Sequence, residues 1–306
     1  MAAAAAGAGC SSSGRPVIGV APKGTSSIFW QSVRAGALAA GDEFDVEILW
    51  NGPPQETEYA RQIQIVDSMI NRRVDGIVLS PAESTALVGV VERADELGIP
   101  LTIFDSGIAT ERYVSYVATD NTAAGALAAD TLSELLAGQG EIAMIQHVAG
   151  SDSTERRERG FESALETDHP GLNIVARQFC LSDRARALAI SEDFLTAHPG
   201  LQGFFGSSEA ATIGAARALR ARGRSGAVKL VGFDASPSLQ VDLREGVIDA
   251  LIVQDPFRIG YAGVETIVLK LKGETPPRRI DLPARAIRAA DLDDPEVQRL
   301  LNPTEG

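Results

Sequence analysis

The sequence contains few of the residues that build metal sites, disulfide frameworks or nucleic-acid surfaces. Two cysteines cannot form a disulfide framework, and the three histidines, His147, His169 and His198, lack the close spacing usual in zinc sites. We expect Cys180 to be buried as a small apolar residue. With 28 Lys and Arg against 41 Asp and Glu, the net charge is -13, which repels phosphates. We therefore expect no metal, no cofactor and no nucleic-acid partner.

Enzyme signatures are also missing. The sequence has no Gly-x-Ser-x-Gly elbow, no Gly-x-x-x-x-Gly-Lys-Ser/Thr phosphate loop, no Gly-x-Gly-x-x-Gly and no His-Glu-x-x-His. The carboxylates Asp105 and Asp234 leave one enzymatic alternative open, a general acid and base for glycoside cleavage. The acidic cluster from Asp291 to Glu296 lacks the glycine and spacing of a calcium loop, so we expect a solvated tail there. No apolar run approaches the roughly 20 residues that a membrane-spanning helix needs.

The amino-terminal segment, residues 1–14, has a composition of its own. Between Met1 and Cys10 it contains only Ala and Gly, and three serines and a glycine follow as a polar tether. Small residues before a cysteine and a soft tether after it resemble the end of a bacterial lipoprotein signal, in which Cys10 carries the lipid. A basic region and a longer apolar core are missing, so we expect a truncated or mis-started signal. A disordered leader without function is the alternative.

From Pro16 onward, short runs rich in Val and Ile alternate with longer segments of helical periodicity, which predicts βα units and parallel sheets. The predicted strands are 17–21, 46–50, 76–79, 101–104, 114–118, 142–146, 174–179, 203–205, 229–233 and 250–253. Predicted helices include 56–71, 85–97, 122–137, 154–166, 184–197, 209–222 and 258–271. A chain of 306 residues suits two sheets of five or six strands better than one sheet of ten. We therefore predict an α/β protein with two doubly wound parallel-sheet domains.

Polar and aromatic side chains follow many of these strands, at the edge where ligands bind to open parallel sheets. Carboxylates accept hydrogen bonds from hydroxyl groups, an amide both donates and accepts, and flat rings cover apolar C–H faces. This mixture predicts a hydroxyl-rich ligand. For each residue alone, helix capping or core packing is the alternative. The strand-end residues are Lys23 to Ser27, Phe29, Trp30, Ser80, Asp105, Ser106, Ser207, Ser208, Asp234, Gln254 and Asp255.

Four motifs resemble the ribose-type family of bacterial periplasmic sugar-binding proteins that feed ABC transporters: VSYVATDN at 114–121, RERGF at 157–161, VGFD at 231–234 and KGE at 272–274. The resemblance spans about residues 16–281. It implies the type I periplasmic-binding fold, in which a three-segment hinge joins two domains and the ligand binds in the cleft between them. On this chain, residues 15–119 with 256–281 would form the first domain, and residues 120–255 with 282–306 the second.

The resemblance also implies the roles of individual residues. The stacking aromatics of the family fall on Phe29 and Trp30, its two aspartates on Asp105 and Asp234, its guanidinium on Arg159, and its hinge glutamine on Gln254. Where ribose binders carry Asn or Arg, this chain has Ser27, Ser80, Ser106 and Ser208, and Ser182 replaces a third aromatic. Shorter side chains imply another monosaccharide or a sugar alcohol instead of ribose, or more bridging water. The alternative for Arg159 is an exposed helix charge paired with Glu155.

The function that the resemblance implies is that of a solute-binding protein, a monomer without enzymatic activity. It would capture a sugar or polyol, close about its hinge and dock on an ABC transporter permease in the periplasm or on the outer face of the membrane. Its membrane contact would be a lipid on Cys10. The effector domain of a LacI-type sugar-responsive repressor is an alternative, although Met1 to Arg15 is too short and too weakly charged for a helix-turn-helix. A glycosidase or sugar isomerase is another, which product formation would identify.

Overall fold

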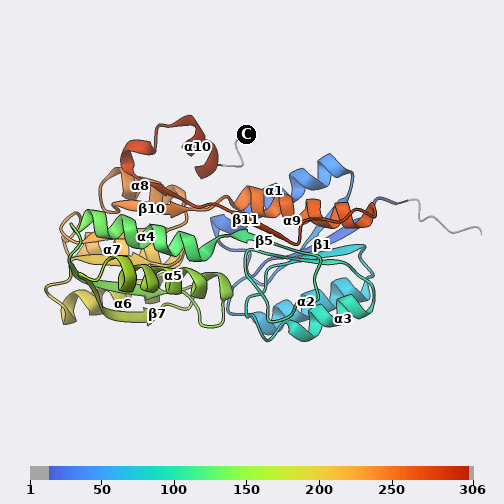
Figure 1. The fold of residues 1–306 in the computed structure, drawn as a ribbon, viewed down its shortest axis with the longest axis horizontal. Helices are drawn as coiled ribbons and strands as arrows, with labels where there is room; N and C mark the ends of the chain where they lie inside the picture. The colour runs from blue at the N-terminus through green and yellow to red at the C-terminus, as the bar shows by residue number, and fades with distance from the viewer. Residues whose placement is uncertain (1–13, 303–306) are drawn as a thin grey trace, which may run out of the picture.

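Two six-stranded sheets, one in each of two lobes, organise the chain (Figure 1). The computed structural model describes residues 14–302, so Cys10 lies outside the described residues. In spatial order, the first sheet consists of β11 (Arg279–Leu282), β5 (Ser115–Thr119), β4 (Leu101–Phe104), β3 (Gly76–Leu79), β1 (Val17–Ala21) and β2 (Glu47–Trp50). All neighbouring strands of this sheet are parallel.

The second sheet follows the same plan except at one edge. Its spatial order is β12 (Arg285–Ile287), β10 (Ala250–Val253), β9 (Lys229–Phe233), β8 (Gly203–Gly206), β6 (Gly140–Gln146) and β7 (Leu172–Phe179). Strand β12 runs antiparallel to β10, whereas the other pairs are parallel. Only Pro283 and Ala284 separate β11 from β12, so the chain passes directly from the first sheet into the second. A strand that leaves one sheet directly for the other must run against the second sheet, because the carboxyl ends of both sheets face each other.

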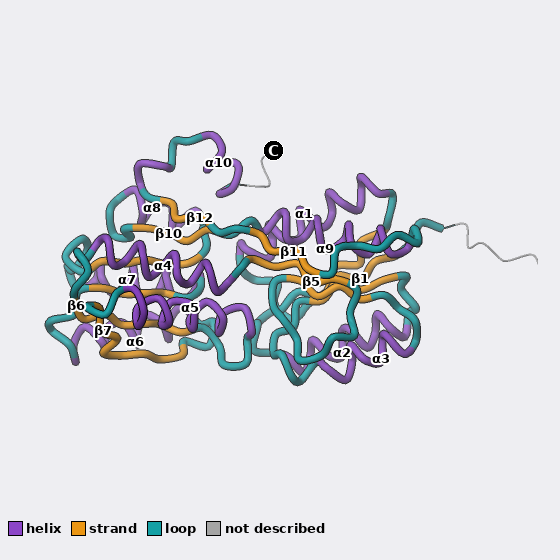
Figure 2. Tube along the Cα trace, viewed as in Figure 1, coloured by secondary structure: helices purple, strands orange, loops and turns teal. Residues whose placement is uncertain are grey.

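Helices cover both faces of the first sheet (Figure 2). On one face lie α1 (Ile28–Phe44) and α9 (Pro256–Leu271), and on the other α2 (Tyr59–Asn71) and α3 (Val88–Glu96). Alternate residues of β1 serve the two faces, since Ile18 and Val20 pack with the first helix pair and Ala21 packs with the second. A strand buried on both sides needs a continuous apolar run, which is the pattern from which these strands were predicted.

The second sheet is covered in the same way. On one face lie α4 (Asn121–Leu135) and α5 (Asp152–Asp168). On the other lie α6 (Arg184–Ala197), α7 (Glu209–Ala221), α8 (Pro237–Arg244) and α10 (Pro295–Leu301). The prediction of an α/β fold with two doubly wound, mainly parallel sheets is confirmed, with β12 as the antiparallel exception.

The chain passes from one sheet to the other three times. It leaves the first sheet after β5, returns to it after β10, and leaves it again between β11 and β12. All ten predicted strands are present, with ends within two residues of those predicted, whereas β11, β12, α1, α8 and α10 were not among the predicted elements. The domain boundaries at residues 119, 255 and 281 stay predictions.

The acidic segment near the carboxyl end is solvated as expected, since Asp293, Asp294 and Glu296 are exposed, but it is also an ordered capping structure. The carboxylate of Asp294 accepts from the main-chain N–H groups of Glu296 and Val297 at 2.7 and 3.3 Å, and so caps α10. The carboxylate of Asp291 accepts from the N–H of Arg288 at 2.8 Å. Val297 is buried against the second lobe, so the segment closes this end of the core. Among the helices within residues 14–302, none combines the length and apolar character needed to span a bilayer.

Candidate functional site

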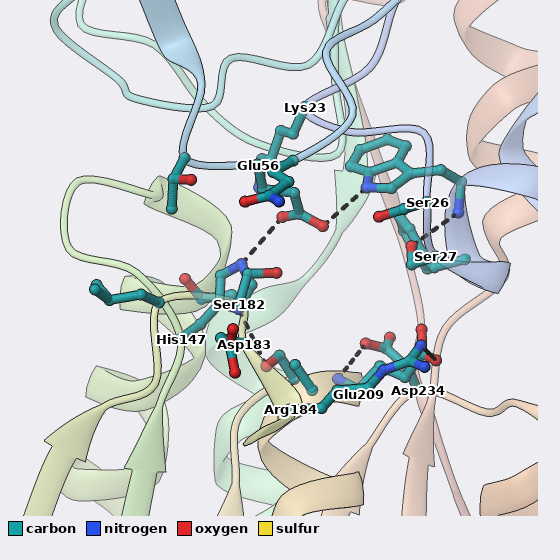
Figure 3. Close-up of a pocket in the computed structure, with 18 of the residues that line it drawn as sticks. Lys23, Ser26, Ser27, Glu56, His147, Ser182, Asp183, Arg184, Glu209 and Asp234 are labelled. Atoms are coloured by element: carbon teal, nitrogen blue, oxygen red, sulfur yellow. Dashed lines mark hydrogen bonds and ion pairs between the residues drawn. The ribbon is translucent and has the colours of Figure 1, made fainter. Parts of the chain in front are cut away.

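A cleft of about 850 Å³ lies where the carboxyl ends of the two sheets face each other. Figure 3 shows side chains from both lobes directed into it. In the first lobe β1 and β4 end at the cleft, and in the second lobe β6, β9 and β10 do. This is the edge at which open parallel sheets bind ligands. The predicted residues that line the cleft are Lys23, Ser26, Ser27, Phe29, Trp30, Asp105, Ser208, Asp234 and Gln254, and Ser182 lines it as well.

The two aspartates take the same backbone conformation at matching places in the two lobes. Asp105 directly follows β4 with φ 60°, and Asp234 directly follows β9 with φ 66°. The left-handed region is costly for residues other than glycine and is tolerated best by short polar side chains. Neither aspartate is the N-cap of the helix next along the chain, since Ser236 holds that place before α8 and β5 follows β4 without a helix between them. The strained turn aims each carboxyl group into the cleft.

Asp105 is held by its own lobe through one oxygen. Its Oδ2 accepts from Ser80 Oγ at 2.8 Å and lies 3.0 Å from Lys23 Nζ. The same ammonium donates to Ser151 Oγ at 3.1 Å and to Ser153 Oγ at 2.8 Å in the second lobe. Lys23 is 3% exposed, so its three donors are all used within the protein. The Lys23 ammonium therefore ties the lobes together and orients Asp105, whose Oδ1 has no hydrogen-bond partner within residues 14–302.

Asp234 is held by both of its oxygens. Oδ1 accepts from Gln254 Nε2 at 2.6 Å, and Oδ2 accepts from the main-chain N–H of Glu209 at 3.1 Å. Burial raises the pKa of Asp234, while the nearby charge of Arg157 and these hydrogen bonds oppose the rise. The carboxylate is thus fixed in position and balanced by a guanidinium in the same lobe.

The guanidinium at the site belongs to Arg157, which corrects the prediction of Arg159. Arg159 is exposed on α5 and does not line the cleft, whereas Arg157 is 2% exposed and does. Arg157 donates to Ser207 O at 2.6 Å and to Asn121 Oδ1 at 2.9 Å. Its guanidinium carbon lies 3.5 Å from the centre of the Phe233 ring, a cation–π contact. Residues two apart on a helix point to opposite sides, which explains why only one arginine of the motif reaches the cleft.

The Nε of Arg157 and the Oε2 of Glu209 are buried without a hydrogen-bond partner within residues 14–302. Both side chains line the cleft. Burying an unpaired donor or acceptor costs about 1–3 kcal/mol. Such groups are expected where a bound molecule completes the hydrogen bonding.

Ser80 and Ser106 do not line the cleft, so the structure corrects their predicted role as ligand contacts. Both are fully buried. Ser80 orients Asp105 through the hydrogen bond described above, and Ser106 Oγ accepts from the N–H of Ser153 in the other lobe at 3.1 Å. Ser27 lines the cleft and caps α1 by accepting from the N–H of Trp30 at 3.4 Å. Ser27 therefore both caps α1 and lines the cleft.

The aromatic residues of the cleft come from the first lobe. Phe29 and Trp30 begin α1 and contact each other edge to face, with ring centres 5.0 Å apart. Trp30 is only 2% exposed and packs against Phe104 behind it. In the second lobe Leu181 and Ser182 occupy the loop after β7, both with left-handed backbone. Aromatic cover for a bound molecule therefore comes from the first lobe, and the second lobe adds the exposed side chain of Leu181.

Two residues that the sequence did not single out for this site, Glu56 and His147, form an ion pair between the lobes. Glu56 Oε2 lies 3.0 Å from His147 Nε2. Burial alone lowers the pKa of His147, but hydrogen bonds to Cys180 and Glu56 and the charge of Glu56 raise it to about 9. Burial alone raises the pKa of Glu56, but the hydrogen bond and charge of His147, with Lys23 and Trp30, lower it to about 2. Both groups are charged at neutral pH.

A sequence signal for His147 existed, because it directly follows β6 and so stands at a strand end like the predicted residues. Glu56 lies in the loop between β2 and α2, and nothing in its neighbourhood marks it. Cys180 is fully buried, as predicted. Its Sγ lies 3.9 Å from the carbonyl oxygen of His147.

Comparison with known proteins agrees with this architecture. The family model described as the periplasmic binding protein domain matches residues 18–275. The D-ribose/D-allose-binding protein of Pseudomonas aeruginosa is 30% identical to this chain over 275 residues, which cover 87% of this chain and 86% of that protein. Its identity over nearly the full length means that the similarity includes both lobes.

Two solved structures are similar over almost the whole chain. A carbohydrate transporter solute-binding protein from Agrobacterium radiobacter, in complex with D-arabinose, has a TM-score of 0.92 and 33% identity. The alignment covers 95% of this chain and 100% of the Agrobacterium radiobacter chain. An ABC transporter solute-binding protein from Agrobacterium vitis, with bound D-fucose, has a TM-score of 0.90 and 35% identity and covers 93% and 99% of the two chains.

Proposed function

This chain belongs to the family of periplasmic binding protein domains, and we propose that it captures a monosaccharide or sugar alcohol and delivers it to an ABC transporter permease. The observation that carries the proposal is the cleft, into which fixed carboxylates, a guanidinium and an aromatic pair converge from two lobes. The names of the similar proteins, which include binders of ribose, allose, arabinose and fucose, support the same class of ligand.

The chemistry of the cleft fits a small polyhydroxylated molecule. Asp105 Oδ1 is an acceptor for hydroxyl protons, and the Nε of Arg157 is a donor for hydroxyl or ring oxygens. Phe29 offers a partly exposed ring for C–H groups. Each of these groups comes from a different element, so the ligand hydroxyls would be read from several directions at once.

We further propose that the preferred ligand is not ribose. Ser27, Ser182 and Ser208 line the cleft where the resembling ribose binders carry longer side chains, which leaves more room or more bridging water. A monosaccharide with a different hydroxyl pattern, or a sugar alcohol, would use that room. If ribose bound more tightly than every hexose, pentitol and hexitol tested, this part of the proposal would be refuted.

Closure of the cleft would signal that the ligand is bound. The lobes are connected through three passages of the chain, and the two domains of the proposal are discontinuous, 15–119 with 256–281 and 120–255 with 282–306. A ligand that contacts both lobes binds the closed form more tightly than the open form, and this difference drives closure. A permease would then recognise the closed form.

The proposed setting is the periplasm or the outer face of the cell membrane, with the protein acting as a monomer. A lipid on Cys10 would anchor it there, and mass spectrometry of the protein from its native host would detect the added acyl chains. The loss of that mass in a Cys10→Ala variant would identify the site.

Two alternative functions have less support. The effector domain of a LacI-type repressor would share the fold, but the two similar structures above are named as solute-binding proteins of transporters. A glycosidase would need one carboxylic acid to donate a proton and a second carboxylate to act on the sugar. Asp105 is instead paired with Lys23 and Asp234 with Gln254, an arrangement that favours binding over proton transfer.

The proposal is tested by a thermal-shift screen of the purified protein against pentoses, hexoses, polyols and autoinducer-like furanoses, followed by calorimetry. We expect one class to raise the melting temperature in a concentration-dependent way, without product in chromatography of the sugar. Product formation would establish an enzyme instead. No shift with any member of the panel would overturn the sugar assignment while leaving the fold unaffected.

A further inference from the structure

Four side chains form a continuous chain of polar contacts over the cleft. In the first lobe, Trp30 Nε1 donates to Glu56 Oε1 at 2.9 Å. Glu56 Oε2 lies 3.0 Å from Nε2 of His147 in the second lobe, and His147 Nδ1 lies 3.1 Å from Ser208 Oγ. Figure 3 shows Glu56 and His147 facing each other between the two lobes. The chain begins and ends at residues that line the cleft, so it bears directly on the site.

The ion pair at the centre of this chain is shielded from solvent. The side chains of His147 and Glu56 are 5% and 18% exposed, which makes their attraction stronger than that of a surface pair. Other contacts also tie the two lobes together. They include the Lys23 contacts with Ser151 and Ser153 and the hydrogen bond from the Gly107 N–H to Asp152 Oδ2 at 3.2 Å.

The charges around the pair come from several elements. Glu158 of α5 accepts from the main-chain N–H of His147 at 3.0 Å. Cys180, which directly follows β7, lies close to the carbonyl oxygen of His147. Electrostatic interactions with Glu56 also involve Lys23 after β1, Arg157 of α5 and Glu209 of α7. Among these groups His147 alone has an ordinary pKa in the physiological range and contacts Glu56 directly across the lobes. Burial raises the pKa of Glu209 to about 7, but its charged partner Arg184 belongs to its own lobe.

We propose that Glu56 and His147 form an interlobe clasp that closes the cleft over its ligand and works fully only while His147 is protonated. The inference rests on the proposed binding function and adds to it a pH dependence and two residues outside the predicted site. In the open form the two side chains separate, so the clasp contributes only to the closed form.

The protonation of His147 also decides what Ser208 can offer to a ligand. When both ring nitrogens of His147 carry hydrogen, Nε2 donates to Glu56 and Nδ1 donates to Ser208 Oγ. Ser208 also accepts from the Ala211 N–H at 3.4 Å, so its own hydroxyl hydrogen is left to donate into the cleft. When His147 is neutral and Nε2 keeps the hydrogen, Nδ1 accepts the Ser208 hydrogen. Ser208 then offers a ligand only an acceptor.

The direction of the pH effect follows from the two states of His147. In the closed form its pKa is about 9, and in an open, solvated form it would return toward its ordinary value near 6.5. The clasp is therefore complete below about pH 6.5 and is lost as the pH rises through 9. Glu56, with its pKa lowered to about 2, remains ionised throughout this range.

The first test needs no ligand. The chain has three histidines, so NMR of the imidazole groups in the unliganded protein can follow each one through a pH titration. Because the unliganded protein samples both forms, the pKa of His147 should lie between its ordinary value and about 9, according to the fraction that is closed, and should fall in Glu56→Gln. His169 and His198, which lie outside the cleft lining, should not respond to that substitution. An unchanged titration of His147 in Glu56→Gln would overturn the clasp.

The second test follows closure and affinity. Small-angle scattering of the unliganded protein should give a larger radius of gyration at pH 9.5 than at pH 6, and His147→Gln, which cannot titrate, should remove the difference. Affinity for D-arabinose, D-fucose or a tighter sugar from the panel should fall tenfold to a hundredfold over the same range. Glu47→Gln, an exposed carboxylate of the first lobe, should behave like the wild type.

Ser208→Ala tests whether the Ser208 hydroxyl donates a hydrogen bond to the ligand, as distinct from the effect of His147 on closure of the cleft. It should weaken sugar affinity by tenfold or more at pH 6 and by less than threefold at pH 9.5. Equal effects at the two pH values, or equal pH slopes in the wild type and His147→Gln, would contradict the proposal. If no sugar of the panel binds, the proposed function fails, but the imidazole titration and the scattering still decide whether the clasp exists.

Discussion

The Thr119 hydroxyl donates to Gln254 Oε1 at 2.7 Å, and this hydrogen bond joins two of the passages between the lobes. Thr119 ends β5 of the first sheet, and Gln254 directly follows β10 of the second. Through its amide Nε2, Gln254 also holds Asp234 in the cleft. One amide therefore connects the hinge to the binding site.

We expect Gln254→Glu to weaken sugar binding by about 1.4 kcal/mol or more, which is tenfold or more in affinity. The new carboxylate still accepts from Thr119, but it faces the Asp234 carboxylate where an amide donor stood. Calorimetry with a sugar from the screening panel at pH 8 measures the effect. Thr119→Val, which removes only the hydroxyl at the hinge, should have a smaller effect. Wild-type affinity in Gln254→Glu would show that the contact with Asp234 does not matter.

The two arginines of α5 provide a matched pair of variants. Arg157→Ala should lower the free energy of unfolding by about 3 kcal/mol, because it leaves the buried Asp234 uncompensated and removes the contacts with Ser207, Asn121 and Phe233. Arg159→Ala removes an exposed side chain and should change it by less than about 0.5 kcal/mol. Urea unfolding of both variants measures these changes.

Arg157→Lys separates binding from folding. A lysine keeps the positive charge but not the planar fork, so we expect a folded protein with sugar affinity at least tenfold weaker. If sugar binding depended on Arg159 and not on Arg157, Arg159 would be the guanidinium of the site, as the sequence predicted.

The close packing of α4 against α5 holds Arg157 in position. A Cβ on Gly125 would lie 2.0 Å from the carbonyl oxygen of Arg157, so only glycine fits there. We expect Gly125→Ala to destabilise the fold by about 1–3 kcal/mol and to weaken sugar binding by displacing α5. Gly89→Ala in α3 is the control, because a Cβ there meets nothing within 4 Å. It should stabilise the protein by about 0.5–1 kcal/mol. Equal stabilities of the two variants in urea unfolding would contradict this packing argument.

The edge at which the site forms was predictable from the sequence, because parallel strands bring their carboxyl ends together. Asp105, Asp234 and Gln254 reach the cleft for that reason. The continuous apolar runs identified the strands that are buried on both faces. They did not identify β11, which alternates the charged Arg279 and Asp281 with apolar residues at the sheet edge.

Other features depend on spacing within a helix or on contacts between the lobes. The buried positions of α5 include Ser153, Arg157, Phe161 and Ala164, a helical period that excludes Arg159 and was available in the sequence. No local pattern pairs Glu56 with His147, since 91 positions separate them and only the docking of two lobes brings them together. The capping roles of Asp294 at α10 and of Asp291 at the short 3₁₀ turn before it were not predicted from the sequence either.

The last prediction concerns the pH dependence of stability through Glu209. Burial and the charge of Asp234 raise the pKa of Glu209 to about 7, although Arg184 Nη2 lies 2.9 Å from its Oε1 and opposes the rise. The folded state therefore holds this proton more tightly than the unfolded state, whose carboxyl titrates near 4.3. The contribution of Glu209 to stability is fully present below that value and is lost as the pH rises through 7.

Glu209→Gln removes this titration and places a neutral amide in the same space. We expect the variant to gain stability relative to the wild type on going from pH 5 to pH 8, as measured by urea unfolding at both pH values. Glu166→Gln, an exposed carboxylate of α5, should show no such change between the two pH values. A wild-type-like pH profile in Glu209→Gln would mean that the ion pair with Arg184 offsets the cost of burial. In that case Arg184→Ala should destabilise the protein more at pH 8 than at pH 5, because the buried carboxylate would then be ionised without its partner.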